Sequence, residues 1–137
     1  MQNTMRIYGS LFMAIAFVLG AFASHYLKSI LKPESILSFD VGVRYLVYHG
    51  LALLILSTIP LDSPKKQQQI VRLFIVGSCL FSGSIFMLSF KALIPFSISL
   101  LGPITPVGGG LLITAWVLLF FQFLKQKNKK TNKKLVY

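Results

Sequence analysis

Four apolar stretches separated by polar segments organise this sequence. Each stretch contains at most one charged residue, and the four stretches run over about residues 7–24, 41–59, 70–90 and 107–123. A helix needs about 20 mainly apolar residues to cross the hydrocarbon core of a bilayer. The pattern therefore predicts an all-α fold, an integral membrane four-helix bundle formed by residues 1–124.

The first apolar stretch has a second interpretation. Ala21-Phe22-Ala23 resembles the A-x-A cleavage site of a secretory signal peptide. Only Arg6 provides positive charge ahead of the stretch, and the apolar run is long for a signal peptide, which favours an uncleaved helix. Small residues recur at every fourth position and would let another helix approach closely: Ala16, Gly20 and Ser24.

A mixed segment, residues 25–40, joins the first two spans. Leu27, Ile30 and Leu31 share one helical face, with lysines elsewhere, which predicts a short interfacial helix that ends at Pro33.

The second span carries polar side chains at helical spacing. Arg44 and Tyr48 are four residues apart, and so are Tyr45 and His49. Polar groups are costly in lipid, so we expect this stripe to point inward. Asp40 lies four residues before Arg44 and is well placed to pair with it.

Two interpretations of this polar cluster stay open. Its arginine could bind an anion, a lipid phosphate or a transported solute through its forked donors. Alternatively, the cluster is an internal network that fixes the helix register. Haem ligation by His25 and His49 is disfavoured, because the first lies at the outer end of its span and the second near mid-membrane. We expect no metal and no cofactor.

The centre of the third span is rich in small residues, among them Gly77, Ser78, Ser82 and Ser84. Such a face suits packing against a bulky polar stripe, which predicts that the second and third spans pair. The single cysteine, Cys79, excludes an intramolecular disulfide.

A helix break precedes the fourth span. Thr105 is suited to the N-cap and Pro106 to the first turn, followed by Gly108 and Gly109. A helix N-terminus can hold an anion, and broken helices form binding sites in transporters. The alternative is a glycine-lined helix crossing.

The distribution of charge predicts the orientation of the chain in the membrane. There are 14 Lys and Arg residues against 3 Asp and Glu, and six of the lysines lie in residues 125–137. We expect this basic tail to be disordered and to contact anionic lipid headgroups; nucleic-acid binding is not expected. The positive-inside rule places both termini in the cytoplasm, with ten basic residues inside and four outside.

Four motifs occur in order along nearly the whole chain: G-A-F-A-S-H (Gly20 to His25), F-x-x-x-V-R-Y-x-x-Y-H-G-L (Phe39 to Leu51), F-S-G-S (Phe81 to Ser84) and G-P-I-T-P-V-G-G (Gly102 to Gly109). With them the chain resembles the YgdD/YwdK-like family of small four-helix membrane proteins. Ala23 and Ser24 stand where that family usually has glycine and then alanine. The resemblance implies a four-span protein of a bacterial cytoplasmic membrane, and it implies no reaction.

The sequence contains no nucleophile elbow, phosphate-binding loop or carboxylate pair. We therefore expect no enzyme. The leading hypothesis is a structural, lipid-contacting or partner-binding membrane component, with a possible homo-oligomer. The alternative is a small oligomeric channel or transporter for a small solute or anion.

Overall fold

The computed structural model describes residues 1–95, 98 and 101–135, with side chains as far as Asn128. Four long helices dominate: α1 (Gln2–Phe22), α3 (Pro33–Leu56), α4 (Pro64–Ser89) and α5 (Ile104–Leu135). The short elements are the π-helical turn η1 (Ala23–Leu27), α2 (Lys28–Ile30) and the 3₁₀ turn η2 (Lys91–Leu93). Over the described ranges the chain contains no strand.

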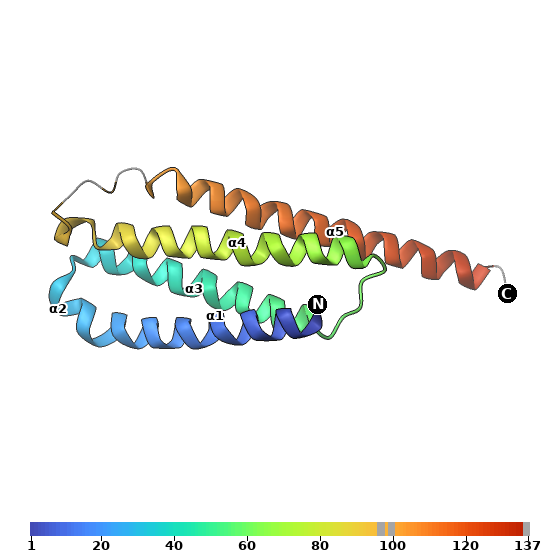
Figure 1. Cartoon of the computed structure of the whole chain (residues 1–137), viewed down its shortest axis with the longest axis horizontal. Helices are drawn as coiled ribbons and strands as arrows, with labels where there is room; N and C mark the ends of the chain where they lie inside the picture. The colour runs from blue at the N-terminus through green and yellow to red at the C-terminus, as the bar shows by residue number, and fades with distance from the viewer. Residues whose placement is uncertain (96–97, 99–100, 136–137) are drawn as a thin grey trace.

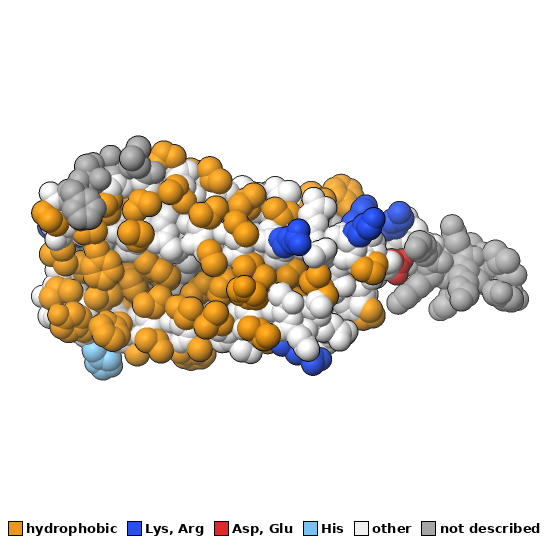
Figure 2. All heavy atoms as spheres, viewed as in Figure 1, with side chains coloured by type: hydrophobic (Ala, Val, Ile, Leu, Met, Phe, Trp, Pro, Cys, Tyr) orange, Lys and Arg blue, Asp and Glu red, His pale blue; other side chains and the backbone are white. Residues whose placement is uncertain are grey.

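Four helices are long and apolar enough to cross a membrane, which confirms the predicted fold class. These segments are Gln2–Ile30, Pro33–Leu56, Pro64–Ser89 and Ile104–Asn128. Hydrophobic side chains cover most of the face shown in Figure 2, and basic side chains gather toward the end that holds the N-terminus. The chain is thus apolar on its outside as well as inside.

The helices form an open row in the order α1, α3, α4, α5 (Figure 1). Among the described residues, the extensive helix pairs are α1 with α3, α3 with α4, and α4 with α5. The predicted pairing of the second and third spans is therefore confirmed. Since α1 and α5 form no extensive pair, they are the two edges, and α3 and α4 are the central and most buried helices.

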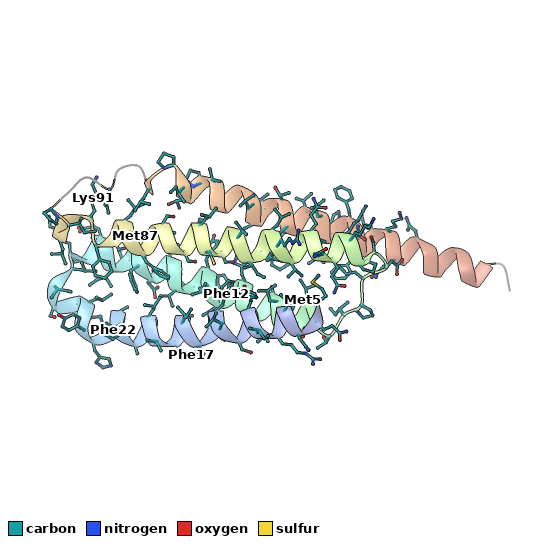
Figure 3. All side chains as sticks on the ribbon, viewed as in Figure 1. Met5, Phe12, Phe17, Phe22, Met87 and Lys91 are labelled. Carbon is teal, nitrogen blue, oxygen red and sulfur yellow. The ribbon has the colours of Figure 1, made fainter. Side chains whose placement is uncertain are left out.

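Side chains of α1 show how the row is held together. Met5 and Phe12 point toward α3 and are almost fully buried, whereas Phe17 points away from it (Figure 3). Helices α1 and α3 pack closely at two glycines, Gly9 and Gly50. Of the small residues predicted to make this contact, Ala16 is buried but Ser24 is exposed. Ala16 and Gly20 of the predicted small-residue face therefore do lie toward other parts of the chain, and the contact between Gly9 and Gly50 lies nearer the N-terminus.

The predicted interfacial helix exists only as an extension of α1. The turn η1 continues α1 directly into α2, so residues 2–30 form one uninterrupted helical segment. The break comes at Leu31 and Lys32, whose backbones are extended, because a residue before proline avoids the helical region. Pro33 then begins α3 at the first helical position, where a missing N–H costs nothing.

The basic tail is helical, whereas the sequence predicts that it is disordered. Helix α5 continues to Leu135, since the segment has no Gly or Pro after Gly110 and Lys and Gln are good helix formers. Gln126 donates a hydrogen bond to the carbonyl of Pro60 (3.0 Å), which joins α5 to the loop before α4. The tail side chains from residue 129 onward, including four of its six lysines, lie outside the described residues.

Candidate functional site

A line of exposed side chains runs along α3. Neighbouring members are three or four residues apart, so they share one face of the helix. We call this face the α3 ridge; its members are Leu37, Asp40, Arg44, Tyr48, Leu51 and Ile55.

An ion pair lies in the middle of the α3 ridge. Arg44 Nε is 3.2 Å from Asp40 Oδ2, and the two side chains are 56% and 51% exposed. The pairing predicted from the four-residue spacing is therefore present. Helix α3 has 24 residues and is about 36 Å long, so Arg44 lies close to its midpoint.

Neighbouring helices show that this midpoint is at membrane depth. Gly20 of α1 packs beside Val43, and the ring of Phe81 in α4 lies 4.6 Å from that of Tyr45, centroid to centroid. Both partners belong to stretches without charged residues. Arg44 is therefore level with the apolar parts of both adjacent helices, far from either end of the row.

The polar stripe does not point inward as predicted. Of its four members, only His49 is buried, while Arg44, Tyr45 and Tyr48 are exposed within the chain. Consecutive helical residues differ in direction by about 100°, so the two pairs of the stripe lie on different parts of the helix surface. The stripe therefore lies at the edge of the buried face of α3, and only His49 is inside the core.

His49 is held by two hydrogen bonds within the chain. Its Nδ1 lies 2.7 Å from the carbonyl oxygen of Tyr45, and Trp116 Nε1–H donates to its Nε2 at 3.3 Å. This pattern assigns the proton to Nδ1, so the neutral ring uses both its donor and its acceptor. The rings of Phe74 and Trp116 pack around it. Trp116, from the fourth span, was not among the predicted site residues.

A groove of about 480 Å³ opens beside the α3 ridge, between α3 and α5 and above α4. Its walls are almost entirely apolar and aromatic: Tyr45, Tyr48, His49, Phe81, Gly109, Leu112, Ile113 and Trp116. Aromatic walls with one satisfied imidazole suit apolar contact better than the passage of an ion.

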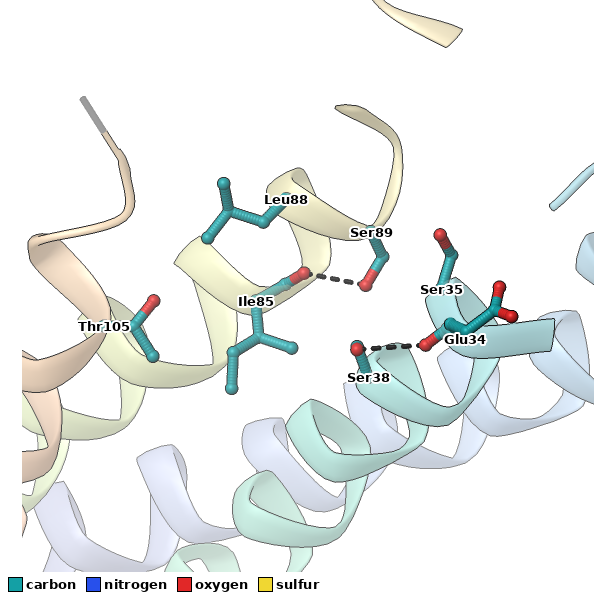
Figure 4. Close-up of a pocket in the computed structure, with 7 residues that line it drawn as sticks. All are labelled: Glu34, Ser35, Ser38, Ile85, Leu88, Ser89 and Thr105. Atoms are coloured by element: carbon teal, nitrogen blue, oxygen red, sulfur yellow. Dashed lines mark hydrogen bonds between the residues drawn. The ribbon is translucent and has the colours of Figure 1, made fainter. Parts of the chain in front are cut away.

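A second hollow, of about 290 Å³ (Figure 4), is lined by the start of α3, the end of α4 and the start of α5, at the end of the row away from the N-terminus (Figure 1). Serines and a carboxylate line it, and two of the serines bond the backbone of their own helices: Ser38 to the Glu34 carbonyl and Ser89 to the Ile85 carbonyl. Deeper in α4, Ser78 and Ser82 are buried, and their hydroxyls have no hydrogen-bond partner among the described residues.

The helix-break residues lie in the first turns of α5. The helix begins at Ile104, so Thr105 is inside the first turn and does not occupy the predicted N-cap. Its hydroxyl contacts that of Ser84 at 2.7 Å. Gly108 packs directly on the backbone of Phe81, which is the geometry of a glycine-lined crossing. Pro106 is exposed and Gly109 lines the groove; anion binding at these residues stays a prediction.

Replacing His49 with leucine is expected to lower the free energy of unfolding by about 1–2 kcal/mol, because the indole N–H of Trp116 loses its acceptor. Trp116 is the only tryptophan, so its fluorescence can follow unfolding in detergent. The matched control is His25→Leu at an exposed position, which should change stability by less than about 0.5 kcal/mol. Equal losses from both variants would contradict the role of this hydrogen bond.

Four apolar helices in an open row, with an ion pair halfway along a central helix, define a small four-span membrane protein. The particular family follows from comparison with known proteins. Residues 19–109 match the family described as Protein of unknown function (DUF423), and the chain belongs to this family. The matched range nearly coincides with the four motifs recognised in the sequence.

Relatives named UPF0382 membrane protein cover most of the chain. One from Haemophilus influenzae is 33% identical over 110 residues, 80% of this chain and 85% of the relative. One from Schizosaccharomyces pombe is 40% identical over 102 residues, 72% and 82% of the two chains. YwdK of Bacillus subtilis is 31% identical over 121 residues, 87% and 94%. The resemblance to the YwdK-like proteins is thus confirmed. No solved structure matches the chain.

Proposed function

We propose that this protein is a non-enzymatic membrane component that binds a partner inside the bilayer. The binding surface is the α3 ridge together with the adjacent aromatic groove. One observation carries the proposal: the Asp40–Arg44 pair is half-exposed although it lies midway along a membrane-spanning helix. Charged side chains at this depth are expensive unless they face protein or water. A partner that covers the ridge removes this cost.

The groove supports the same surface. Tyr48 belongs both to the ridge and to the groove wall, so the two features are continuous. Aromatic side chains give large contact areas at little cost in conformational entropy, which is why they are frequent in protein interfaces. His49 offers no free hydrogen-bonding nitrogen, because Tyr45 and Trp116 use both. Contact here is therefore by shape and apolar area.

The proposed location is the cytoplasmic membrane, with both termini in the cytoplasm. The N-terminus and the last described turns of α5 lie at the same end of the molecule (Figure 1). Arg6 lies near the start of α1, and Lys65 and Lys66 lie in the first turn of α4, both at that end, and this distribution follows the positive-inside rule. The lysine-rich end of α5 would then lie where anionic headgroups are available.

A small channel or transporter is the second candidate. Its support is the same arginine within a membrane-spanning helix, which in an assembly of several copies would line a path between them. The two functions differ in what the ridge touches. In a binding component it touches a packed partner, and in a channel it touches water and a passing solute.

Native mass spectrometry from a mild detergent tests the proposal. We expect the wild-type chain to retain a discrete additional mass, and we expect Arg44→Gln to lose it, since the arginine helps to hold the partner. The control is Arg72→Gln, the same substitution on an exposed arginine in the first third of α4, away from the α3 ridge, which should keep the mass.

A bare single chain in all three samples would contradict the proposal. A retained small solute, lost with Arg44→Gln and accompanied by loss of solute flux in liposomes, would instead favour the channel or transporter.

A further inference from the structure

We infer that the partner is a second copy of this chain, docked ridge against ridge about a twofold axis along the membrane normal. The inference rests on the proposed function and names the partner of the same surface. It depends on the charges, the depth and the shape of the α3 ridge.

The charges of the ridge are self-complementary. The ridge carries one acid and one base a single helical turn apart. In a twofold pair, each residue of one copy lies at the same depth as its counterpart in the other. Two copies therefore bring together two carboxylates and two guanidinium groups, with no net charge. A closed set of four charges needs no ion or headgroup from outside.

Arg44 has the donors that such a set requires. Its contact with Asp40 of the same chain is made by Nε. A guanidinium has five N–H donors in a fixed fork, so it can bind two carboxylates at once. Arg44 already reaches Asp40, which lies one turn earlier on its own helix. In a close twofold pair, Asp40 of the second copy lies at the same depth as Asp40 of the first. Each arginine can then bridge both carboxylates.

The shape of the surface also fits a second helix row. The ridge side chains follow the three- and four-residue spacing of helix packing, and hollows lie on both sides of the ridge. One is the aromatic groove of about 480 Å³. The other, of about 230 Å³, lies between α1 and α3 and is lined partly by Gly20, Ala23 and Ser24. Small residues there allow close approach of the partner's side chains.

Other partners fit the ridge less well. A lipid phosphate lies at the membrane surface, whereas Arg44 is near the middle of a helix about 36 Å long. A different membrane protein would need an acid and a base at matching depth. The chain itself supplies both, and its open row leaves this face of α3 uncovered by α1 or α5.

Mixing two single variants tests the contact between copies. One variant is Asp40→Asn, which keeps Arg44, and the other is Arg44→Gln, which keeps Asp40. Only a mixed dimer can place an arginine opposite an aspartate, while each homodimer opposes two like charges. Co-expressed chains with different tags should give mixed dimers in about fivefold excess over random pairing, equivalent to about 1 kcal/mol.

The control keeps the ridge but removes both charges. Two differently tagged populations of the double variant Asp40→Asn/Arg44→Gln, mixed with each other, should pair at random, and the helix content of each variant is checked by circular dichroism. Random pairing of the two single variants would overturn the inference.

Two further outcomes separate the inference from the proposed function. A wild-type chain that is monomeric but retains a lipid or another protein would overturn self-pairing and leave partner binding intact. A wild-type chain that is monomeric and bare would overturn both.

Discussion

Replacing Gly108 with alanine is expected to lower the free energy of unfolding by about 2 kcal/mol, a typical cost of overpacking. A Cβ at this position would lie 2.5 Å from Phe81 N, 2.9 Å from Phe81 Cα and 3.0 Å from the carbonyl carbon of Leu80. These are backbone atoms of α4, so no side-chain rotation relieves the clash. Helices α4 and α5, an extensive pair of the row, would have to move apart.

The matched control for this variant lies two residues further along the same helix. A Cβ at Gly110 meets nothing within 4 Å, so Gly110→Ala should leave stability unchanged or raise it by up to about 1 kcal/mol through better helix propensity. Unfolding of both variants in detergent can be followed by the fluorescence of Trp116. Similar stabilities for the two variants would show that α5 does not cross α4 at Gly108.

Replacing Gly9 with alanine is expected to destabilise the other edge of the row by about 1–3 kcal/mol. The new Cβ would lie 2.8 Å from Leu54 Cγ and 2.9 Å from the carbonyl oxygen of Gly50. The crossing is reciprocal, because a Cβ at Gly50 would lie 3.1 Å from the Gly9 carbonyl oxygen. Relief requires α1 to shift away from α3, which loosens the packing of Met5 and Phe12. Thermal unfolding in the same detergent measures this effect.

The control for the Gly9 variant is Gly20→Ala. A Cβ at Gly20 would lie 3.7 Å from Val43 Cγ1, an ordinary contact, so this substitution should cost little. If Gly20→Ala were the more damaging of the two, then α1 would pack through the small residues at every fourth position after all.

The number and type of the helices could be predicted because they depend on local sequence. Long apolar runs and the polar loop at Asp62-Ser63-Pro64 mark the spans without any knowledge of packing. The faces that pack depend on the partner helices. Gly9 is an ordinary residue of the first span until Gly50 is placed opposite it, and the spacing of Ala16, Gly20 and Ser24 did not point to this contact.

In the candidate site, too, the features set within one helix could be predicted and those set by packing between helices could not. The Asp40–Arg44 pair could be predicted because both residues are on one helix, four positions apart. The bond from Trp116 to His49 joins residues 67 positions apart and depends on how α5 lies over α4. The outward direction of Arg44 was missed because the stripe was assumed to have its partners within the chain. In the structure Arg44 and its partner Asp40 are both half-exposed, and this exposure is the basis for a partner outside the chain.

The central claim is that the α3 ridge faces protein, not lipid, in the membrane. The most direct test is the oxygen accessibility of a spin label in liposomes, with Cys79 replaced by alanine. Leu51 on the ridge and Leu11 on α1 are similarly exposed, at 43% and 47%. Since Gly9 packs against Gly50 in antiparallel helices, the two positions differ in depth by about three residues, or roughly 5 Å. We predict low accessibility at position 51 and high accessibility at position 11. High accessibility at both positions would contradict the claim, because the ridge would then face lipid.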